Sequence, residues 1–190
     1  MQRLRYITDE EKTPEISDLI AAAEVKGAPD PRIMSIMTRS PLGVLWGKYW
    51  HALLYEGLLP HRLKEMVRLY MSVAHQCGYC STVRSTQGQT EGVTEELVRE
   101  LWQFESSDKL SEQEKAALRY AKRFKAEEGA IDSDESWAEL HDHFSDEEII
   151  ELGLFCADVH GVGQFARSLD VVSWEEACQI NPTLAVQMRD

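Results

Sequence analysis

The chain has 190 residues, a length that fits one folding domain with a hydrophobic core of its own. Its 33 acidic and 20 basic residues give a formal net charge of −13, which repels phosphate groups, so we expect neither nucleic acid nor an anionic membrane as a partner. No apolar run approaches the roughly 20 residues of a membrane span, and the N-terminus lacks the apolar core of a secretory signal.

The first third of the chain predicts helices bounded by proline and glycine. The predicted starts are Pro14 and Pro41, the predicted stops are Gly27 and Gly57, and a short helix is expected over 33–38. Trp46 and Trp50 are i,i+4 neighbours and belong on one helix face. We expect them in the core or in a subunit interface, with a place in a substrate pocket as the weaker alternative.

Pro60 starts the next predicted helix, whose apolar residues have the spacing of a stripe that faces a core. Glu65 lies beside this stripe. Gly78 interrupts the pattern, so Cys77 is expected at a helix boundary and Cys80 in the first turn or two of the following helix.

Later helix starts are indicated by capping residues. Thr94 is a predicted N-cap, and Ser111 and Ser145 each precede a glutamate by three residues, the pattern of a capping box. A short helix is expected over 137–144, a long apolar one over 149–165, and a short helix or an arm laid over a neighbouring element after Trp174. No useful period-2 alternation is present. We predict an all-α fold with about eight helices in one domain over residues 1–190.

The four cysteines of the chain are too sparse for a disulfide scaffold: Cys77, Cys80, Cys156 and Cys178. We therefore expect a cytoplasmic protein whose thiols are mostly reduced. In that compartment a C-x-x-C pair indicates catalysis, redox sensing or metal binding. A helix N-terminus favours the thiolate form, so Cys77 and Cys80 are candidates for a nucleophile and its resolving partner.

Two other interpretations of the cysteine pair stay open. Both residues are also compatible with small buried hydrophobic groups. Alternatively, Cys156 and His160 share one face of a later helix and would complete a Cys₃His metal site if that helix met the pair.

Two stretches carry a resemblance to a known family. The segment 59–65, with Glu65 twelve positions before Cys77-Gly-Tyr-Cys80, resembles the AhpD-like branch of the carboxymuconolactone decarboxylase family, and the segment 144–152 resembles a later helix start of that family. The resemblance covers about residues 40–170, with N-terminal helices and a C-terminal arm added. It implies an all-helical fold assembled as trimers or hexamers, whose active members are thiol peroxidases or disulfide reductases. No cofactor and no metal are expected.

Carried over by position, the family pattern makes Glu65 the relay carboxylate, Cys80 the thiol that meets peroxide and Cys77 the resolving thiol. Arg84 departs from the pattern, because the family usually has histidine there. Arginine keeps its proton and is no general base. As a residue one helical turn after Cys80 it would favour the thiolate by charge, or it would pair with Glu65.

Three histidines are candidates for a replacement base: His160, His75 and His61. The plain alternatives are an exposed position for His61 and His75 and a core position for His160. We predict a thiol-dependent oxidoreductase that reduces a hydroperoxide or a disulfide and is regenerated by a dithiol or lipoyl protein. The main alternative is a non-redox oligomeric scaffold or ligand-binding protein. A small-lactone decarboxylase is disfavoured by the cysteine pair.

Overall fold

The computed structural model describes residues 3–25, 32–126, 131–182 and 184, and within these ranges it contains helices and no strand. The predicted all-α fold class is thus confirmed. The elements are η1 (Asp9–Glu11), α1 (Pro14–Val25), α2 (Arg32–Met37), α3 (Pro41–Tyr55), α4 (His61–Ala74), α5 (Gly78–Thr82), α6 (Thr86–Thr90), α7 (Glu95–Glu100), η2 (Leu101–Ser106), α8 (Glu112–Ala126), α9 (Asp134–His143), α10 (Asp146–Ser168) and α11 (Trp174–Ile180).

The predicted capping signals lie at helix starts. Thr94 accepts a hydrogen bond from the Leu97 N–H, and Ser145 forms a full capping box with Glu148. Within the described residues the structure has more helical elements than the eight expected, because elements as short as α6, η1 and η2 do not show a period. The predicted stop at Gly27 and the chain end after 184 lie outside the described residues.

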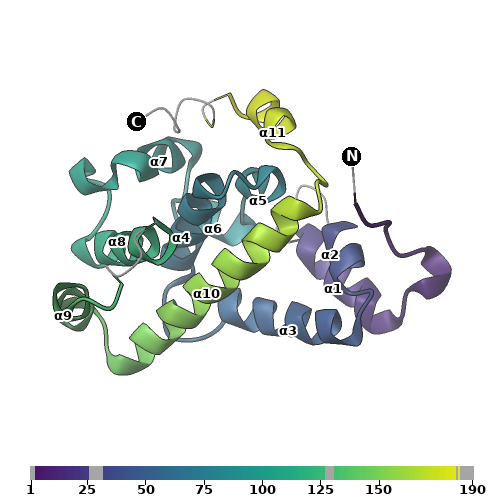
Figure 1. Ribbon diagram of the computed structural model, residues 1–190, viewed down its shortest axis with the longest axis horizontal. Coiled ribbons are helices and arrows are strands. Elements are labelled where there is room, and N and C mark those ends of the chain that lie inside the picture. The colour runs from purple at the N-terminus through teal and green to yellow at the C-terminus, as the bar shows by residue number, and fades with distance from the viewer. Residues whose placement is uncertain (1–2, 26–31, 127–130, 183, 185–190) are drawn as a thin grey trace.

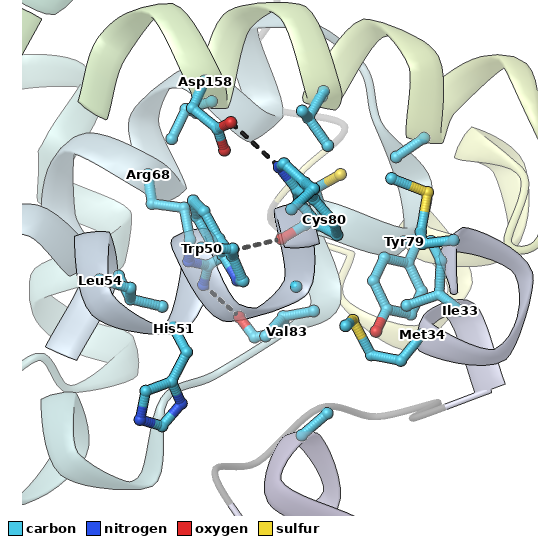
Figure 2. A pocket seen from close by; sticks show the side chains of 18 of the residues that line it. Ile33, Met34, Trp50, His51, Leu54, Arg68, Tyr79, Cys80, Val83 and Asp158 are labelled. Atoms are coloured by element: carbon cyan, nitrogen blue, oxygen red, sulfur yellow. Dashed lines mark hydrogen bonds between the residues drawn. The ribbon is translucent and has the colours of Figure 1, made fainter. Parts of the chain in front are cut away.

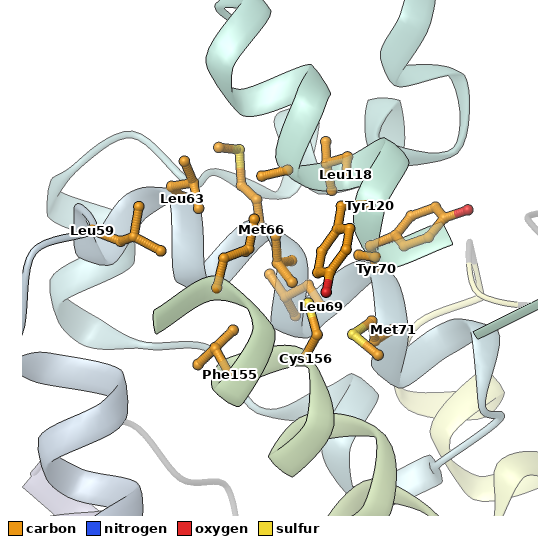
Figure 3. Packing of buried hydrophobic residues seen from close by; sticks show 14 of the residues in the cluster. Leu59, Leu63, Met66, Leu69, Tyr70, Met71, Leu118, Tyr120, Phe155 and Cys156 are labelled. Atoms are coloured by element: carbon orange, nitrogen blue, oxygen red, sulfur yellow. The ribbon is translucent and has the colours of Figure 1, made fainter. Parts of the chain in front are cut away.

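Helix α4 is the centre of the molecule, and its neighbours include α8, α10 and α5 (Figure 1). The sequence predicted one buried stripe on this helix, but nearly every residue from His61 to Val73 is buried. Its core-facing side chains pack with those of α8 and α10 in the main hydrophobic cluster, which includes Met66, Leu118 and Phe155 (Figure 3). Because the other faces are covered too, the charged residues of α4 are buried and need partners.

A second, smaller cluster joins the N-terminal helices to the cysteine pair. Ile33 and Met34 of α2 pack with Cys77, Tyr79 and Ala166. Helices α1, α2 and α3 form one side of the molecule beside α10 (Figure 1). The predicted tail element is α11, which packs against α5.

Gly78 permits the close approach of α11 to α5. A Cβ at this position would lie 2.4 Å from the backbone carbonyl oxygens of Val172 and Ser173. Any larger residue at 78 would push the start of α5 away from the segment that leads into α11.

Helix α10 is long and apolar enough to cross a membrane by length and composition, which the sequence analysis did not recognise. It packs against α4, α5, α8 and α3, and its inner face includes the fully buried Leu152, Phe155 and Cys156. One helix of this kind is weak evidence for a membrane span, because the core helix of a helical bundle meets the same criteria of length and composition.

Candidate active site

The cysteine pair lies at a tight turn between α4 and α5, and Cys77 and Cys80 form a disulfide. Helix α4 ends in a Schellman motif, in which the Cys77 N–H donates to the Ser72 carbonyl and the Gln76 N–H to the Val73 carbonyl. Gln76 takes the left-handed conformation of this motif, with φ of 53°. Cys77 is the N-cap of α5, and the Cys80 N–H donates to its Sγ at 3.2 Å. The predicted helix boundary is therefore correct.

The two cysteines differ in access. Cys77 is completely buried, whereas Cys80 is half-buried and lines a cavity of about 170 Å³. The cavity is mostly apolar, and its walls come from α1, α2, α3, α4, α5 and α10 (Figure 2). Trp46 and Trp50 stack with ring centroids 6.1 Å apart and both line it, so these residues belong to the pocket that the sequence analysis had ranked second. Of the two thiols, Cys80 is the one that a cavity-bound molecule would meet.

Glu65 forms a buried ion pair with Arg68, one helical turn along α4. The Arg68 Nε and Nη2 donate to the two carboxylate oxygens, each at 2.8 Å, and the Ser85 N–H donates to Oε1 at 3.0 Å. Burial acts to raise the pKa of Glu65, but the Arg68 charge and these hydrogen bonds outweigh it, so the net effect is a lowered pKa. Glu65 is thus held as a carboxylate.

Arg68 also ties the ion pair to the cysteine segment. It donates to the Cys80 carbonyl and to the Val83 carbonyl, both at 2.9 Å (Figure 2). Sequence reasoning missed Arg68, although its i+3 position from a buried glutamate is a usable signal. Gly88 of α6 lies against the side chain of Glu65. A Cβ at this position would lie 2.9 Å from Cγ of Glu65, so a larger residue would displace that side chain.

Arg84 does not take either of the places that the sequence suggested for it. Helix α5 ends at Thr82 and Val83 is extended, so Arg84 does not follow Cys80 on one helix face. Its guanidinium pairs with Glu95 and donates to the carbonyls of Ser81 and Val83. The expected helical proximity of Arg84 to Cys80 is wrong, and the expected pairing with Glu65 is replaced by that of Arg68.

His61 is buried rather than exposed, and it lies within a hydrogen-bonded chain. Its Nδ1 is 2.9 Å from the Leu54 carbonyl, which only accepts, so Nδ1 carries the proton. Its Nε2 is 2.7 Å from Oγ of Ser85 and in the neutral ring accepts from that hydroxyl. The Tyr55 hydroxyl is also hydrogen-bonded to Ser85, and burial raises its pKa. Tyr55 and Ser85 both line the cavity, so the chain leads from the cavity to an imidazole.

His75 and His160 contact each other. The His75 Nε2 and the His160 Nδ1 are 3.2 Å apart, and His75 is buried rather than exposed. Among the described residues no group of three or more His, Cys, Asp or Glu side chains is placed to hold a metal ion. Cys156 instead lies fully buried in the main core, where burial raises the pKa of its thiol. The described residues therefore give no support to the predicted alternative of a Cys₃His metal site.

Comparisons of sequence match part of the chain. Residues 42–123 match the carboxymuconolactone decarboxylase family, a shorter segment than the expected 40–170. Two uncharacterized proteins of Mycobacterium tuberculosis are each 34% identical to this chain over 88 residues. That match covers 46% of this chain and spans 31% of the length of those relatives.

Solved structures match almost the whole chain and show the fold. The apo structure of the debrominase Bmp8 gives a TM-score of 0.75 at 22% identity over 96% of both chains. A cysteine-to-alanine variant of Bmp8 in complex with 2,3,4-tribromopyrrole gives 0.77 at 22% identity over 98% of both. A protein of unknown function from Agrobacterium tumefaciens, a candidate antioxidant defence protein AhpD, gives 0.58 at 18% identity over 89% of this chain and 98% of its own. The part of the chain that holds the cysteine pair and the buried ion pair, residues 42–123, is thus similar to the carboxymuconolactone decarboxylase family over less than half of the chain.

Proposed function

We propose that this protein is a thiol-dependent oxidoreductase that reduces a small apolar hydroperoxide or a disulfide in the cavity beside Cys80. The observation that supports this most directly is the Cys77–Cys80 disulfide at the cavity wall, with one sulfur accessible from the cavity and the other buried. Cysteines at i and i+3 can close and open a disulfide with little movement of the backbone, so the pair can take up two oxidising equivalents.

With a hydroperoxide the proposed reaction has two steps. The Cys80 thiolate attacks the terminal peroxide oxygen, the O–O bond breaks, and the alkoxide leaves with one proton as an alcohol. The resulting sulfenic acid is attacked by the Cys77 thiolate, which forms the disulfide and releases water. A dithiol or lipoyl protein then returns two electrons and two protons by disulfide exchange. The hydrogen bond from the Cys80 N–H favours Cys77 as a thiolate for the second step.

The proposed proton path runs through Tyr55 and Ser85 to His61. The three side chains are hydrogen-bonded in series, and the His61 Nε2 is the acceptor at the end of the series. Glu65 and Arg84 then have positioning roles: Glu65 fixes Arg68 on the Cys80 carbonyl, and Arg84 fixes the carbonyls of Ser81 and Val83. The alternative general base in this proposal is His75 or His160. His75 lies at the end of α4 and contacts His160 of α10.

Reductive removal of bromine from a small aromatic ring is a second candidate reaction. It is favoured by the structural match to the debrominase Bmp8, which covers 96% of this chain, and by the stacked tryptophans of the cavity. In this reaction the Cys80 thiolate would take the bromine, the ring carbon would take a proton, and Cys77 would displace bromide to form the same disulfide. Both candidates therefore use the same thiols and differ in the atom that is attacked.

Thiol titration after one equivalent of oxidant tests the proposal. We expect the fully reduced protein to lose two thiols with cumene hydroperoxide or to release one bromide per disulfide with a bromopyrrole. Cys80→Ser should do neither, whereas Cys178→Ser, which changes a half-exposed thiol on α11, should react like the wild type. No loss of thiols with either compound in the wild type would overturn the proposal and favour a non-redox scaffold.

We also propose that the protein acts as a homo-oligomer, a trimer or hexamer by family analogy, in a reducing cytoplasm. An exposed apolar stripe runs along α3. It consists of Leu42, Leu45 and Tyr49, at positions i, i+3 and i+7 of the helix. The adjoining α10 exposes Ile150 and Leu154. Sedimentation equilibrium of the wild type and of Leu45→Glu would test this: the wild type should be oligomeric and the variant should dissociate.

A further inference from the structure

One carboxylate that lines the cavity has an oxygen atom for which the described residues offer no hydrogen-bond donor. Asp158 of α10 lines the cavity that Cys80 also lines, and its Oδ1 accepts a hydrogen bond from the Trp46 indole N–H at 3.0 Å (Figure 2). Its Oδ2 is buried and has no partner among the described residues. Burial raises the pKa of Asp158 against the opposing effect of the Trp46 hydrogen bond. An unsatisfied buried oxygen costs free energy, so a hydrogen-bond donor of a molecule in the cavity would relieve this cost.

The size and lining of the cavity restrict what that partner can be. A cavity of about 150 Å³ is known to hold one benzene molecule, and this one encloses about 170 Å³. Trp46 and Trp50 give it flat aromatic walls, and most of the remaining surface is apolar, with the Glu65–Arg68 pair among the polar groups of the lining. A single five- or six-membered ring fits both the volume and the walls.

The orientation of Asp158 restricts the polar group of the ligand. The indole N–H only donates, so Oδ1 must accept and Oδ2 is the atom left for the ligand. In the ionised form of Asp158, Oδ2 accepts hydrogen bonds, so its complement is an N–H or O–H group of the ligand. Such a donor favours the ionised form and so opposes the rise in pKa that burial causes.

We propose that Asp158 determines the substrate specificity of the thiol site by accepting a hydrogen bond from a ring N–H or a ring hydroxyl of a single-ring substrate. The proposal rests on the proposed function in that Cys80 is the group the bound ring would meet. The substrate class is then a small aromatic ring that has a donor group at one edge and the reducible group at another.

Binding of pyrrole and thiophene to the reduced protein tests this without any turnover. The two rings have the same shape, but only pyrrole has an N–H donor. Ligand-observed NMR titration of the wild type should show about tenfold tighter binding of pyrrole, the factor expected for one hydrogen bond to a charged group. Equal affinities in the wild type would overturn the inference before any variant is made.

Asp158→Asn gives the sharper test. Its amide oxygen must face the Trp46 N–H, so its NH₂ group faces the cavity and opposes a ring N–H. The preference for pyrrole should disappear in this variant and persist in Asp142→Asn, which changes an exposed carboxylate on α9. An unchanged preference in Asp158→Asn would overturn the inference. The proposed function fails separately, by the absence of thiol loss in the wild type with oxidant.

Discussion

The buried Glu65–Arg68 pair makes Glu65→Gln a demanding test of its structural role. The substitution keeps the shape of the side chain but removes the charge that faces the Arg68 guanidinium, and Arg68 is only 5% exposed. Two hydrogen bonds of 2.8 Å are affected, and an amide NH₂ is brought against an arginine N–H. Removing one partner of a buried pair costs about 3–5 kcal/mol, because the other charge stays buried.

Urea unfolding with the cysteines kept reduced measures this loss. With a slope of about 2–3 kcal/mol per molar urea, the midpoint should fall by roughly 1–2 M. Glu114→Gln is a matched control, since Glu114 pairs with Arg62 at 2.7 Å but at a partly exposed position. It should cost less than about 1 kcal/mol. A Glu65→Gln variant as stable as the wild type would refute the structural role of the pair.

The same pair predicts a pH dependence. The pKa of Glu65 is lowered in the folded protein, so the folded state binds its proton less readily than the unfolded chain. The stabilisation is therefore present above the unfolded pKa of about 4.3 and is lost as the pH falls through the folded pKa. Urea midpoints between pH 7 and pH 3 should fall less steeply in Glu65→Gln than in the wild type, and parallel profiles would contradict the assignment.

Three further changes are predicted from the site. Gln76→Gly should raise the free energy of unfolding by about 1 kcal/mol in urea, because glycine adopts the left-handed conformation without strain; a lower value would show that the Gln76 side chain contributes more than its backbone costs. His61→Gln should slow thiol loss with hydroperoxide at least about 100-fold in stopped-flow measurements, as expected for a lost base, whereas a larger effect of His75→Gln would favour the His75–His160 pair. Alkylation of the native protein at pH 8 should modify Cys178 and spare Cys156, whose thiol is buried with a raised pKa; modified Cys156 would indicate opening of the core.

Much of the fold follows from local signals in the sequence. Pro41, Thr94 and Ser145 are recognisable as helix starts because capping depends on residues that are close in sequence. The short helix α6 was not predictable in this way, because five residues are too few for a period, whereas the start of α5 was expected from the break at Gly78. Their positions depend on tertiary contacts such as the approach of α11 at Gly78.

The candidate site was predictable only where it is local. The spacing of Cys77 and Cys80 predicts the disulfide, since both residues lie in one turn. The partner of Glu65 was misjudged because the end of α5 at Thr82 turns Arg84 toward Glu95. Asp158 is 112 positions from Trp46, and no pattern in the sequence indicates that these two side chains meet.

The cavity is built from two parts of the chain, one inside and one outside the segment that matches the family. Its reactive wall, with Cys80 and Arg68, comes from the segment 42–123 that matches the family. The opposite walls come from α1, α2 and α10, which lie outside that segment, and Leu19, Met34 and Asp158 are among their contributions. Substitutions in these walls can therefore reshape the bound molecule's surroundings while the thiol pair and its ion pair stay fixed. Related chains with one reactive wall and different opposite walls would share a chemistry and differ in what they accept.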